Sequence, residues 1–269
     1  MLIAQISDLH IAPPGEKTLG RVAMDENLRA VVAHINAQVP RPDMVIVSGD
    51  ITDQGDLASA RYARSMLDAL DMPYYVVPGN HDTRAVILEA FAPDHCRADM
   101  ADFISYTVET HDIRLIALDS TIAGAPGGAL CPARLKWLAQ TLAEQPDTPS
   151  LIFLHHPPIK CGVPESDTDG FIGALEFANL IHAQSNILRV TCGHIHLMTF
   201  SGWGGTSLST SPSIGMRLRL DLTQTLVSEF LTDTPSYQLH LHTGEGNLVT
   251  HTQLMDETGG PYQFAPLKT

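Results

Sequence analysis

The chain has 269 residues, of which 44% are hydrophobic and 17% charged, and this composition is typical of a globular protein. Its formal net charge of −14 argues against a nucleic-acid polymer as a partner, because binding a phosphate backbone requires a basic surface. The first residues, MLIAQISDLH, lack a basic region and a cleavage site, and no apolar run approaches the ~18 residues of a membrane span. We therefore expect a cytoplasmic protein without a membrane segment. The four cysteines are scattered without a CxxC pair, and we expect free thiols.

The first 200 residues alternate short apolar runs with stretches of helical spacing. The apolar runs predict buried strands over residues 2–7, 44–48, 74–77, 151–154 and 187–191. Helical spacing predicts helices over residues 24–38, 57–70, 84–91, 133–144 and 173–183. Residues 103–118 predict a hairpin that turns at His111 and Asp112. This alternation indicates an α/β fold in which strands lie between layers of helices.

The pattern changes after about residue 205. Short strands separated by turns are predicted within residues 207–214, 225–231, 237–242 and 247–254, with almost no helix. We interpret residues 1–269 as a single domain, with a core over residues 1–204 and a C-terminal β extension over residues 205–269.

Polar residues of a particular kind follow five of the predicted strands. They are the segments SDLH (7–10), SGD (48–50, with Asp53 soon after), PGNHD (78–82), HHPP (155–158) and CGHIH (192–196). In an open α/β sheet, the carboxyl ends of the strands form the ligand crevice. Any one of these residues could be a turn, cap or core residue, but five coincidences at equivalent positions predict one site. Gly49 and Gly79 would let the backbone pass close to it.

The residue types at these strand ends indicate metal chemistry. Asp, Asn and His without Cys suit divalent ions such as Mn, Fe, Zn or Co. The candidates exceed the three or four protein ligands of one catalytic ion, whereas two ions about 3.5–4 Å apart, bridged by a carboxylate, would use them all. Asp8 and His10 alternate to one side of an extended chain, so both could reach one ion. His194 and His196 would lie about 6.5 Å apart along an extended chain, which predicts one ion for each.

Taken together, the motifs D-x-H, G-D, G-N-H-D, H-H-P-P and G-H-x-H, in this order, resemble those of the calcineurin-like metallophosphoesterase superfamily. Within it, the chain is similar to bacterial class III cyclic-nucleotide phosphodiesterases and related glycerophosphodiesterases. The motifs run from residue 8 to residue 196, about 70% of the chain. They are specific as a set, although a single D-x-H or G-D would carry no information.

The resemblance implies a four-layer α/β/β/α sandwich with two divalent metal ions. It assigns one metal to Asp8, His10 and His196, the other to Asn80, His155 and His194, and makes Asp50 the bridge. It places His81 at the substrate phosphate. It also suggests a dimer or higher homo-oligomer, with the C-terminal strands as a possible interface.

The implied activity is hydrolysis of a small phosphodiester, either a 3′,5′-cyclic nucleotide or a glycerophosphodiester. Asn80 and Asp50 would hold the metals, and a metal-bound hydroxide would attack phosphorus in line with the leaving alkoxide. His81 would stabilise the phosphoryl oxygens or protonate the leaving group. A role for His81 in orienting Asn80 remains an alternative.

Three other functions stay open. A phosphomonoesterase would use the same metals but usually needs extra cationic groups, and the helical spacing of Arg84 favours a solvated or paired side chain. A DNA-processing nuclease is disfavoured by the acidic charge. A non-catalytic scaffold, as in retromer-type assemblies, tends to lose metal ligands, whereas all seven positions are filled here.

The segment after H-H-P-P departs from the cyclic-nucleotide group. Residues 157–172 carry Asp167 and Asp169 where we would expect an apolar recognition segment, and both would repel a second negative charge. Residues 120–131 are small and uncharged and should leave room for a second ester substituent. We therefore expect diesters to be preferred over monoesters. We expect His155 to ligate a metal and His156 to pack behind it.

Overall fold

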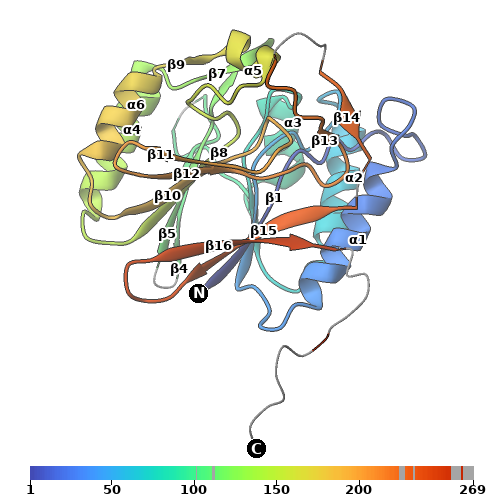
Figure 1. Cartoon of the computed structure of the whole chain (residues 1–269), viewed down its shortest axis with the longest axis horizontal. Coiled ribbons are helices and arrows are strands. Elements are labelled where there is room, and N and C mark those ends of the chain that lie inside the picture. Colours follow the sequence, from blue (N-terminus) through green and yellow to red (C-terminus); the bar gives the residue numbers. More distant parts are fainter. Residues whose placement is uncertain (101, 111–112, 224–227, 233, 256–261, 263–269) are drawn as a thin grey trace, which may run out of the picture.

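Two β-sheets face each other at the centre of the molecule, and helices cover their outer faces (Figure 1). This is a computed structural model that describes the chain except for residues 101, 111–112, 224–227, 233, 256–261 and 263–269. The arrangement confirms the four-layer α/β/β/α sandwich. None of the helices in the described part is both long and apolar enough to cross a lipid bilayer.

The first sheet has the strand order β16-β15-β1-β2-β3. Its strands are β1 (Leu2–Ile6), β2 (Met44–Val47), β3 (Tyr74–Val76), β15 (Ser236–His242) and β16 (Leu248–Leu254). β1, β2 and β3 are parallel, whereas β15 runs antiparallel to β1 and to β16. All four residues of β2 are buried, as expected for a strand covered on both faces.

The second sheet has the strand order β11-β12-β10-β8-β5-β4. Its strands are β4 (Tyr106–Thr110), β5 (Ile113–Leu118), β8 (Ser150–Leu154), β10 (Ile187–Cys192), β11 (Thr199–Trp203) and β12 (Thr206–Thr210). β5, β8, β10 and β12 are parallel. β4 and β5 form the predicted hairpin, and its expected turn at His111 and Asp112 lies outside the described residues. β11 was not predicted.

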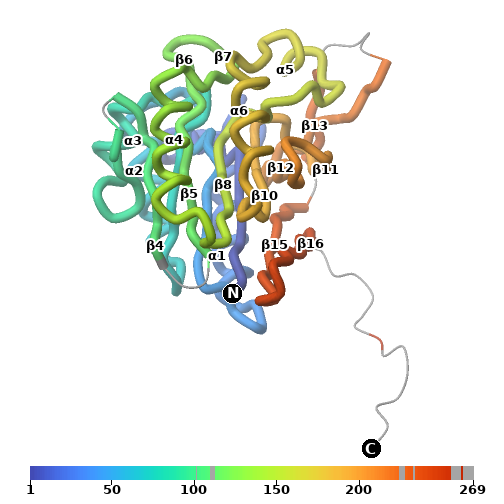
Figure 2. The backbone as a smooth tube through the Cα atoms, turned by 90° about the vertical axis from the view of Figure 1, so that its left-hand side faces the viewer, coloured from blue at the N-terminus to red at the C-terminus, as the bar shows by residue number. Residues whose placement is uncertain are grey.

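Each sheet has its own set of helices. They are α1 (Met24–Asn36), α2 (Leu57–Leu67), α3 (Arg84–Phe91), α4 (Pro132–Glu144) and α6 (Ala174–His182). Buried residues of α1, α2 and α3 share a core with β1, β2 and β3, whereas those of α4 and α6 pack with β5, β8 and β10. Figure 2 shows α4 and α6 in front of β5, β8 and β10. All five predicted helices are therefore present, with ends shifted by up to three residues.

The C-terminal strands complete both sheets. β12 pairs with β10, and β15 pairs with β1, so each sheet contains strands from both sides of position 204. We infer that the described residues before and after position 204 form one domain, because separating the two parts would break both sheets. Of the strand predicted within residues 225–231, only β14 (Phe230–Leu231) is present in the described part.

Short elements rise above the carboxyl ends of the parallel strands (Figure 1). They are β6 (Thr121–Ile122), β7 (Ala125–Ala129), α5 (Pro164–Asp169), β9 (Phe171–Ile172), β13 (Arg217–Leu218) and β14. β6, β7 and β9 form a small sheet, and β13 pairs with β14. Residues 120–131 and 157–172, for which no helix or strand was predicted, therefore contain strands and a helix. Main-chain hydrogen bonds across these segments account for the difference, including Gly128 N to Gly170 O at 3.0 Å.

The five polar strand ends come from two sheets and not from the crevice of one. β1, β2 and β3 of the first sheet and β8 and β10 of the second end at the same side of the sandwich. The buried Gln5 of β1 links the two sheets beneath this point, because its Nε2 donates to Cys192 O in β10 and to Oγ of Ser48, which directly follows β2. Packing of the two sheets thus brings the strand ends together.

Candidate metal centre

Asp50 lies between side chains from both sheets. Its Oδ2 is 3.3 Å from Nε2 of His155 and 3.6 Å from Nε2 of His10. Its Oδ1 accepts a hydrogen bond from the main-chain N–H of His81 at 2.9 Å. The side chain is almost fully buried. One carboxylate oxygen therefore faces ligand atoms on two sides, as a bridging carboxylate must.

One group of candidate ligands lies on the first side of Asp50. Asp8, His10 and His196 each offer one atom, and these atoms lie within 4.8 Å of one another. The Nε2 atoms of His10 and His196 are 3.1 Å apart, and Nε2 of His196 is 3.5 Å from Oδ1 of Asp8. These are the residues that the resemblance assigns to one metal.

The second group gathers around Asn80. Its side-chain oxygen is 3.1 Å from Nε2 of His155 and 3.0 Å from Nδ1 of His194. His194 and His196 thus lie in different groups, as the prediction of one ion each requires. The seven predicted ligands come together in two sets that share Asp50.

The extended backbone assumed in the sequence analysis is wrong at these positions. Asp8, His10, Asp50, His194 and His196 have φ angles of 53°, 42°, 49°, 73° and 53°, in the left-handed region. Each such non-glycine residue costs on the order of 1–3 kcal/mol, and such residues cluster at functional sites. The strand ends turn sharply because each chain must bend over the edge of its sheet to aim its side chain at the centre. Alternation along a strand therefore does not explain how Asp8 and His10 meet.

Hydrogen bonds behind the imidazoles fix their tautomers. Nδ1 of His155 donates to the Ser48 carbonyl at 2.8 Å, and Nδ1 of His196 donates to the Met216 carbonyl at 2.6 Å. A neutral imidazole carries one N–H, so each ring directs the lone pair of Nε2 at the centre. Metal-ligating histidines are typically held in this way.

These contacts fit a divalent cation. Without a cation, the bare Nε2 of His196 would face the carboxylate of Asp8 at 3.5 Å, lone pair against lone pair. A metal ion converts such contacts into ligand bonds. The donor set is nitrogen and oxygen without sulfur, which suits hard to borderline ions.

The pKa shifts of the clustered side chains also fit a bound cation. Burial opposes protonation of His155, but the carboxylates of Asp50 and Asp8 outweigh it and raise its pKa to about 9. Burial raises the pKa of Asp8 to about 6. Burial also lowers the pKa of His194 to about 3 and lowers that of His196, so both remain neutral. The cluster therefore favours positive charge between its carboxylates while His194 and His196 keep lone pairs free.

His81 stands at the edge of this centre without belonging to either group of ligands. Its Nδ1 donates to the main-chain carbonyl of Asp53 at 2.7 Å, which leaves Nε2 for another partner. Burial opposes its protonation, but the nearby Asp50 carboxylate raises its pKa above the usual value. The hydrogen bond to Asp53 therefore orients the His81 ring and leaves Nε2 without this partner.

Comparisons with known proteins agree with this geometry. The sequence model of the calcineurin-like phosphoesterase family matches residues 1–198. The chain belongs to the calcineurin-like phosphoesterase family. It is 36% identical to a probable glycerophosphodiester phosphodiesterase GpdQ of Arcobacter nitrofigilis, over 98% of this chain and 97% of the relative.

One further relative and one solved structure resemble this phosphoesterase. It is 26% identical to the 3′,5′-cyclic adenosine monophosphate phosphodiesterase CpdA of Escherichia coli K12, over 95% of this chain and 90% of the relative. Its fold is similar to the crystal structure of a dimetal phosphatase from Danio rerio, with a TM-score of 0.65 and 16% identity. That match covers 89% of this chain and 92% of the other. The family predicted from the motifs is thus confirmed.

In this phosphoesterase, Asp82 secures the loops that carry Asp50 and Asn80. One carboxylate oxygen accepts from the main-chain N–H groups of Ile51 and Gly79, both at 3.0 Å. The other accepts from the N–H of Thr52 at 2.9 Å and from its hydroxyl at 2.8 Å. Asp82 was visible in the G-N-H-D motif, but no role was predicted for it.

His156 lies behind the ligands. Its Nε2 donates to the Pro126 carbonyl at 3.1 Å, and its Nδ1 is 2.9 Å from the Ser120 hydroxyl. Its ring packs against those of His155 and His194, with centroids 4.7 Å from each. Because both nitrogens have protein partners, this geometry is what we expect of a packing residue.

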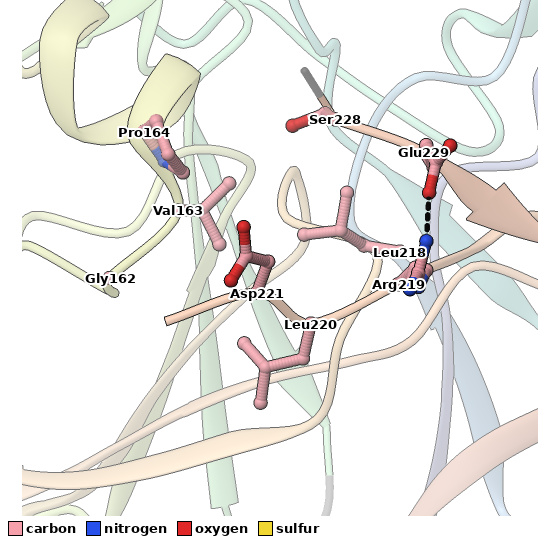
Figure 3. Close-up of a pocket in the computed structure, with 9 residues that line it drawn as sticks. All are labelled: Gly162, Val163, Pro164, Leu218, Arg219, Leu220, Asp221, Ser228 and Glu229. Atoms are coloured by element: carbon pink, nitrogen blue, oxygen red, sulfur yellow. Dashed lines mark hydrogen bonds and ion pairs between the residues drawn. The ribbon is translucent and has the colours of Figure 1, made fainter. Parts of the chain in front are cut away.

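A cavity of about 330 Å³ opens onto the metal centre. Asn80, His81, His194 and His196 form its inner wall. Its outer wall includes residues of α5 and β14 that the sequence did not associate with the site, because only the tertiary structure brings them there. A narrow cleft lies beside it, where Val163 and Pro164 face Leu218 across the gap (Figure 3).

The acidic residues of α5 divide into two kinds. Asp169 lines the cavity, as expected. The expectation for Asp167 is wrong, because its carboxylate accepts from the N–H groups of Cys161 at 2.7 Å and Gly162 at 3.0 Å and does not line the cavity. The Asp167 carboxylate instead stabilises the turn at Cys161 and Gly162.

Gly79 provides a test of how tightly the centre is built. A Cβ atom at this position would lie 2.1 Å from Oδ1 of Asp50, so Gly79→Ala should displace the shared carboxylate. We expect the variant to retain its fold but to lose metal. Elemental analysis together with circular dichroism measures both properties. Gly202→Ala is the control, because no atom lies within 4 Å of the added methyl group. Full metal content in Gly79→Ala would contradict this description of the centre.

Proposed function

We propose that this phosphoesterase hydrolyses small phosphodiesters with two divalent metal ions. The observation that carries the proposal is the position of Asp50 between two groups of ligands, of which His10, Asn80, His194 and His196 line a cavity of about 330 Å³. Asp8, His10 and His196 would hold one ion, and Asn80, His155 and His194 the other. When bound, two such ions supply Lewis-acid activation of water and of the phosphoryl oxygens.

The charge of the centre suits a diester. Two divalent cations, less the charges of Asp8 and Asp50, would leave about two positive charges for a nucleophile and a substrate. A diester carries one negative charge and would match this site, whereas a monoester dianion would exceed it. The described residues that line the cavity include Asp53, Glu165, Asp169 and Glu229 but no Lys or Arg.

Arg84 does not change this balance. Its guanidinium donates to both carboxylate oxygens of the buried Asp119 and to the Thr121 carbonyl. The prediction that this side chain is solvated or paired is confirmed, and Arg84 does not grip a phosphate. This argues against the phosphomonoesterase alternative, because monoesters are usually held by extra cationic groups.

His81 is proposed as the general acid. It lines the cavity, and its Nδ1 is committed to the Asp53 carbonyl. A proton on Nε2 can therefore be transferred to the leaving alkoxide. The main-chain N–H of His81 also donates to Oδ1 of Asp50, so the proposed general acid and the proposed bridging carboxylate are directly linked.

The substrate class follows from the cavity and from the relatives. We propose glycerophosphodiesters ahead of cyclic nucleotides, since a 36% identical relative carries the former name over nearly the whole chain. Among the described lining residues, Phe230 alone offers an aromatic side chain of Phe, Tyr or Trp type for stacking on a base. The metals are proposed to be Mn, Fe, Zn or Co.

We also propose a cytoplasmic homo-oligomer. β16 and β11 are the outer strands of their sheets on the same side of the sandwich, where Thr252 contacts Met198. Val249, Leu254 and Phe200 on these strands expose much of their side chains. Exposed apolar edge strands usually require a partner.

The direct test of the proposed function compares two substrates. We expect manganese-loaded enzyme to hydrolyse bis(p-nitrophenyl) phosphate with a kcat/KM at least about tenfold above that for p-nitrophenyl phosphate, a difference of about 1.4 kcal/mol in transition-state stabilisation. Both substrates release p-nitrophenolate. The ratio of their kcat/KM values therefore reports the effect of the substrate's charge and of its second ester group. Equal rates, or a faster monoester, would favour a phosphomonoesterase.

The proposed role of His81 predicts a dependence on the leaving group. His81→Ala should keep both metals and lower kcat by about 10²-fold for alkyl diesters, whose alkoxides need a proton. The loss should be much smaller for p-nitrophenyl esters, whose leaving group is stable without one. The exposed His182 at the end of α6 supplies the control variant His182→Ala, which should not affect turnover. A loss of the same size for both types of ester would rule out general-acid catalysis.

A further inference from the structure

The ligands of the proposed second ion come from both sheets. Asn80 follows β3 of the first sheet, whereas His155 and His194 follow β8 and β10 of the second. Asp82 ties the loop of Asn80 to the chain that follows β2, and so fixes this loop within the first sheet. The distance from Asn80 to the two histidines also depends on how the same loop is held against the second sheet.

Arg84, four residues after Asn80, connects this loop to the second sheet. It is the first residue of α3, and its Nε and Nη2 donate to the two carboxylate oxygens of Asp119, at 2.5 and 3.2 Å. Its Nη2 also donates to the Thr121 carbonyl at 2.9 Å. Asp119 directly follows β5 and is fully buried. Because a bidentate ion pair has a defined geometry, it fixes the start of α3 against the end of β5.

Asp119 is itself held firmly in place. Its Oδ1 accepts hydrogen bonds from the main-chain N–H of Thr121 at 2.9 Å and from the Thr121 hydroxyl at 2.7 Å. The buried Arg134 of α4 donates to the carbonyls of Asp119 and Thr121, at 2.8 and 3.0 Å. The guanidinium carbons of Arg84 and Arg134 also lie 4.7 and 4.4 Å from the ring centroid of Phe103. The partner of Arg84 is therefore a rigid part of the structure.

Ser120 links this anchor to the metal ligands. It is the central residue of the segment 119–121, and its hydroxyl accepts from the main-chain N–H of His156 at 3.1 Å and lies 2.9 Å from Nδ1 of the same residue. The ring of His156 packs against those of His155 and His194. One buried segment thus contacts the start of α3 and also the ring behind two ligands of the second ion.

We propose that the ion pair of Arg84 and Asp119 positions the ligands of the second ion, because it sets the distance of Asn80 from the two histidines. The inference rests on the proposed function, since it requires that ion. Loss of a partner behind metal ligands typically lowers metal affinity by about 10–100-fold. The contacts that link Arg84 to the second ion do not include Asp8 or His10, so the affinity of the first ion should change little.

Titration with manganese tests the proposal. Arg84→Lys keeps the positive charge but lacks the planar fork that binds both oxygens of Asp119. Calorimetric titration of the metal-free variant with Mn²⁺ should show a second ion that binds about tenfold more weakly than in the wild type, and an unchanged first ion. In a His10→Ala background, which keeps the second set of ligands, Arg84→Lys should weaken binding about tenfold. In an Asn80→Ala background it should have no effect.

Turnover and a matched control separate positioning from a general loss of stability. At limiting Mn²⁺, Arg84→Lys should lose activity, and saturating Mn²⁺ should restore most of it. The control is Arg114→Lys. Arg114 is also buried and also forms ion pairs, with Glu109 and Glu144, but it lies at the opposite end of β5. This variant should keep the wild-type affinity for both ions. Asp119→Asn, which weakens the same ion pair from its other side, should behave as Arg84→Lys does and serves if that variant does not fold.

The outcomes distinguish this inference from the proposed function. Unchanged affinity for the second ion in Arg84→Lys, when the wild type binds two ions, would overturn the positioning role and leave the proposed function intact. Equal weakening of both ions, or the same weakening in Arg114→Lys, would also overturn it, because the effect would then be general. A wild-type protein that binds fewer than two ions would overturn both.

Discussion

The structure of the site depends on one carboxylate that two groups of imidazoles share. Asp50 faces His10 on one side and His155 on the other, and this arrangement fits cations between them, because neutral His155 and His196 donate from Nδ1 to carbonyls and direct bare Nε2 atoms inward. The surrounding architecture serves this arrangement. Gly79 makes room for the carboxylate, and Asp82 holds the two loops on either side of it.

The sequence indicated the buried strands and the candidate residues that the structure brings together for the same reason. Strands buried on both faces are almost wholly apolar. Polar residues shortly after such strands, for example Asp8, Asp50 and His155, are therefore conspicuous. Their order along the chain also indicated the family, which the comparison confirmed. The sequence did not reveal that these strand ends belong to two different sheets, since strand order depends on pairing between distant segments.

The outer wall of the cavity could not be predicted either. It is built by α5 and β14, which are short, lack a strong periodic pattern and are more than 50 residues apart in the chain. Asp167 and Asp169 show what could not be predicted from residue type. Both are acidic residues in one short segment, and only the turn at Cys161 and Gly162 decides that Asp167 is occupied within the protein. Left-handed backbone at Asp8 and His10 likewise has no signal in residue type, because it follows from packing at the edge of the sheet.

The most direct test of the account is the metal content of the wild-type protein and of Asp50→Ala. After manganese loading and dialysis, elemental analysis should find two ions per wild-type chain. Asp50 is the one proposed ligand that touches both ions, so Asp50→Ala should retain at most one ion and lose nearly all activity, with an unchanged circular dichroism spectrum. Two tightly held ions in Asp50→Ala would contradict the shared carboxylate and the dinuclear centre built on it.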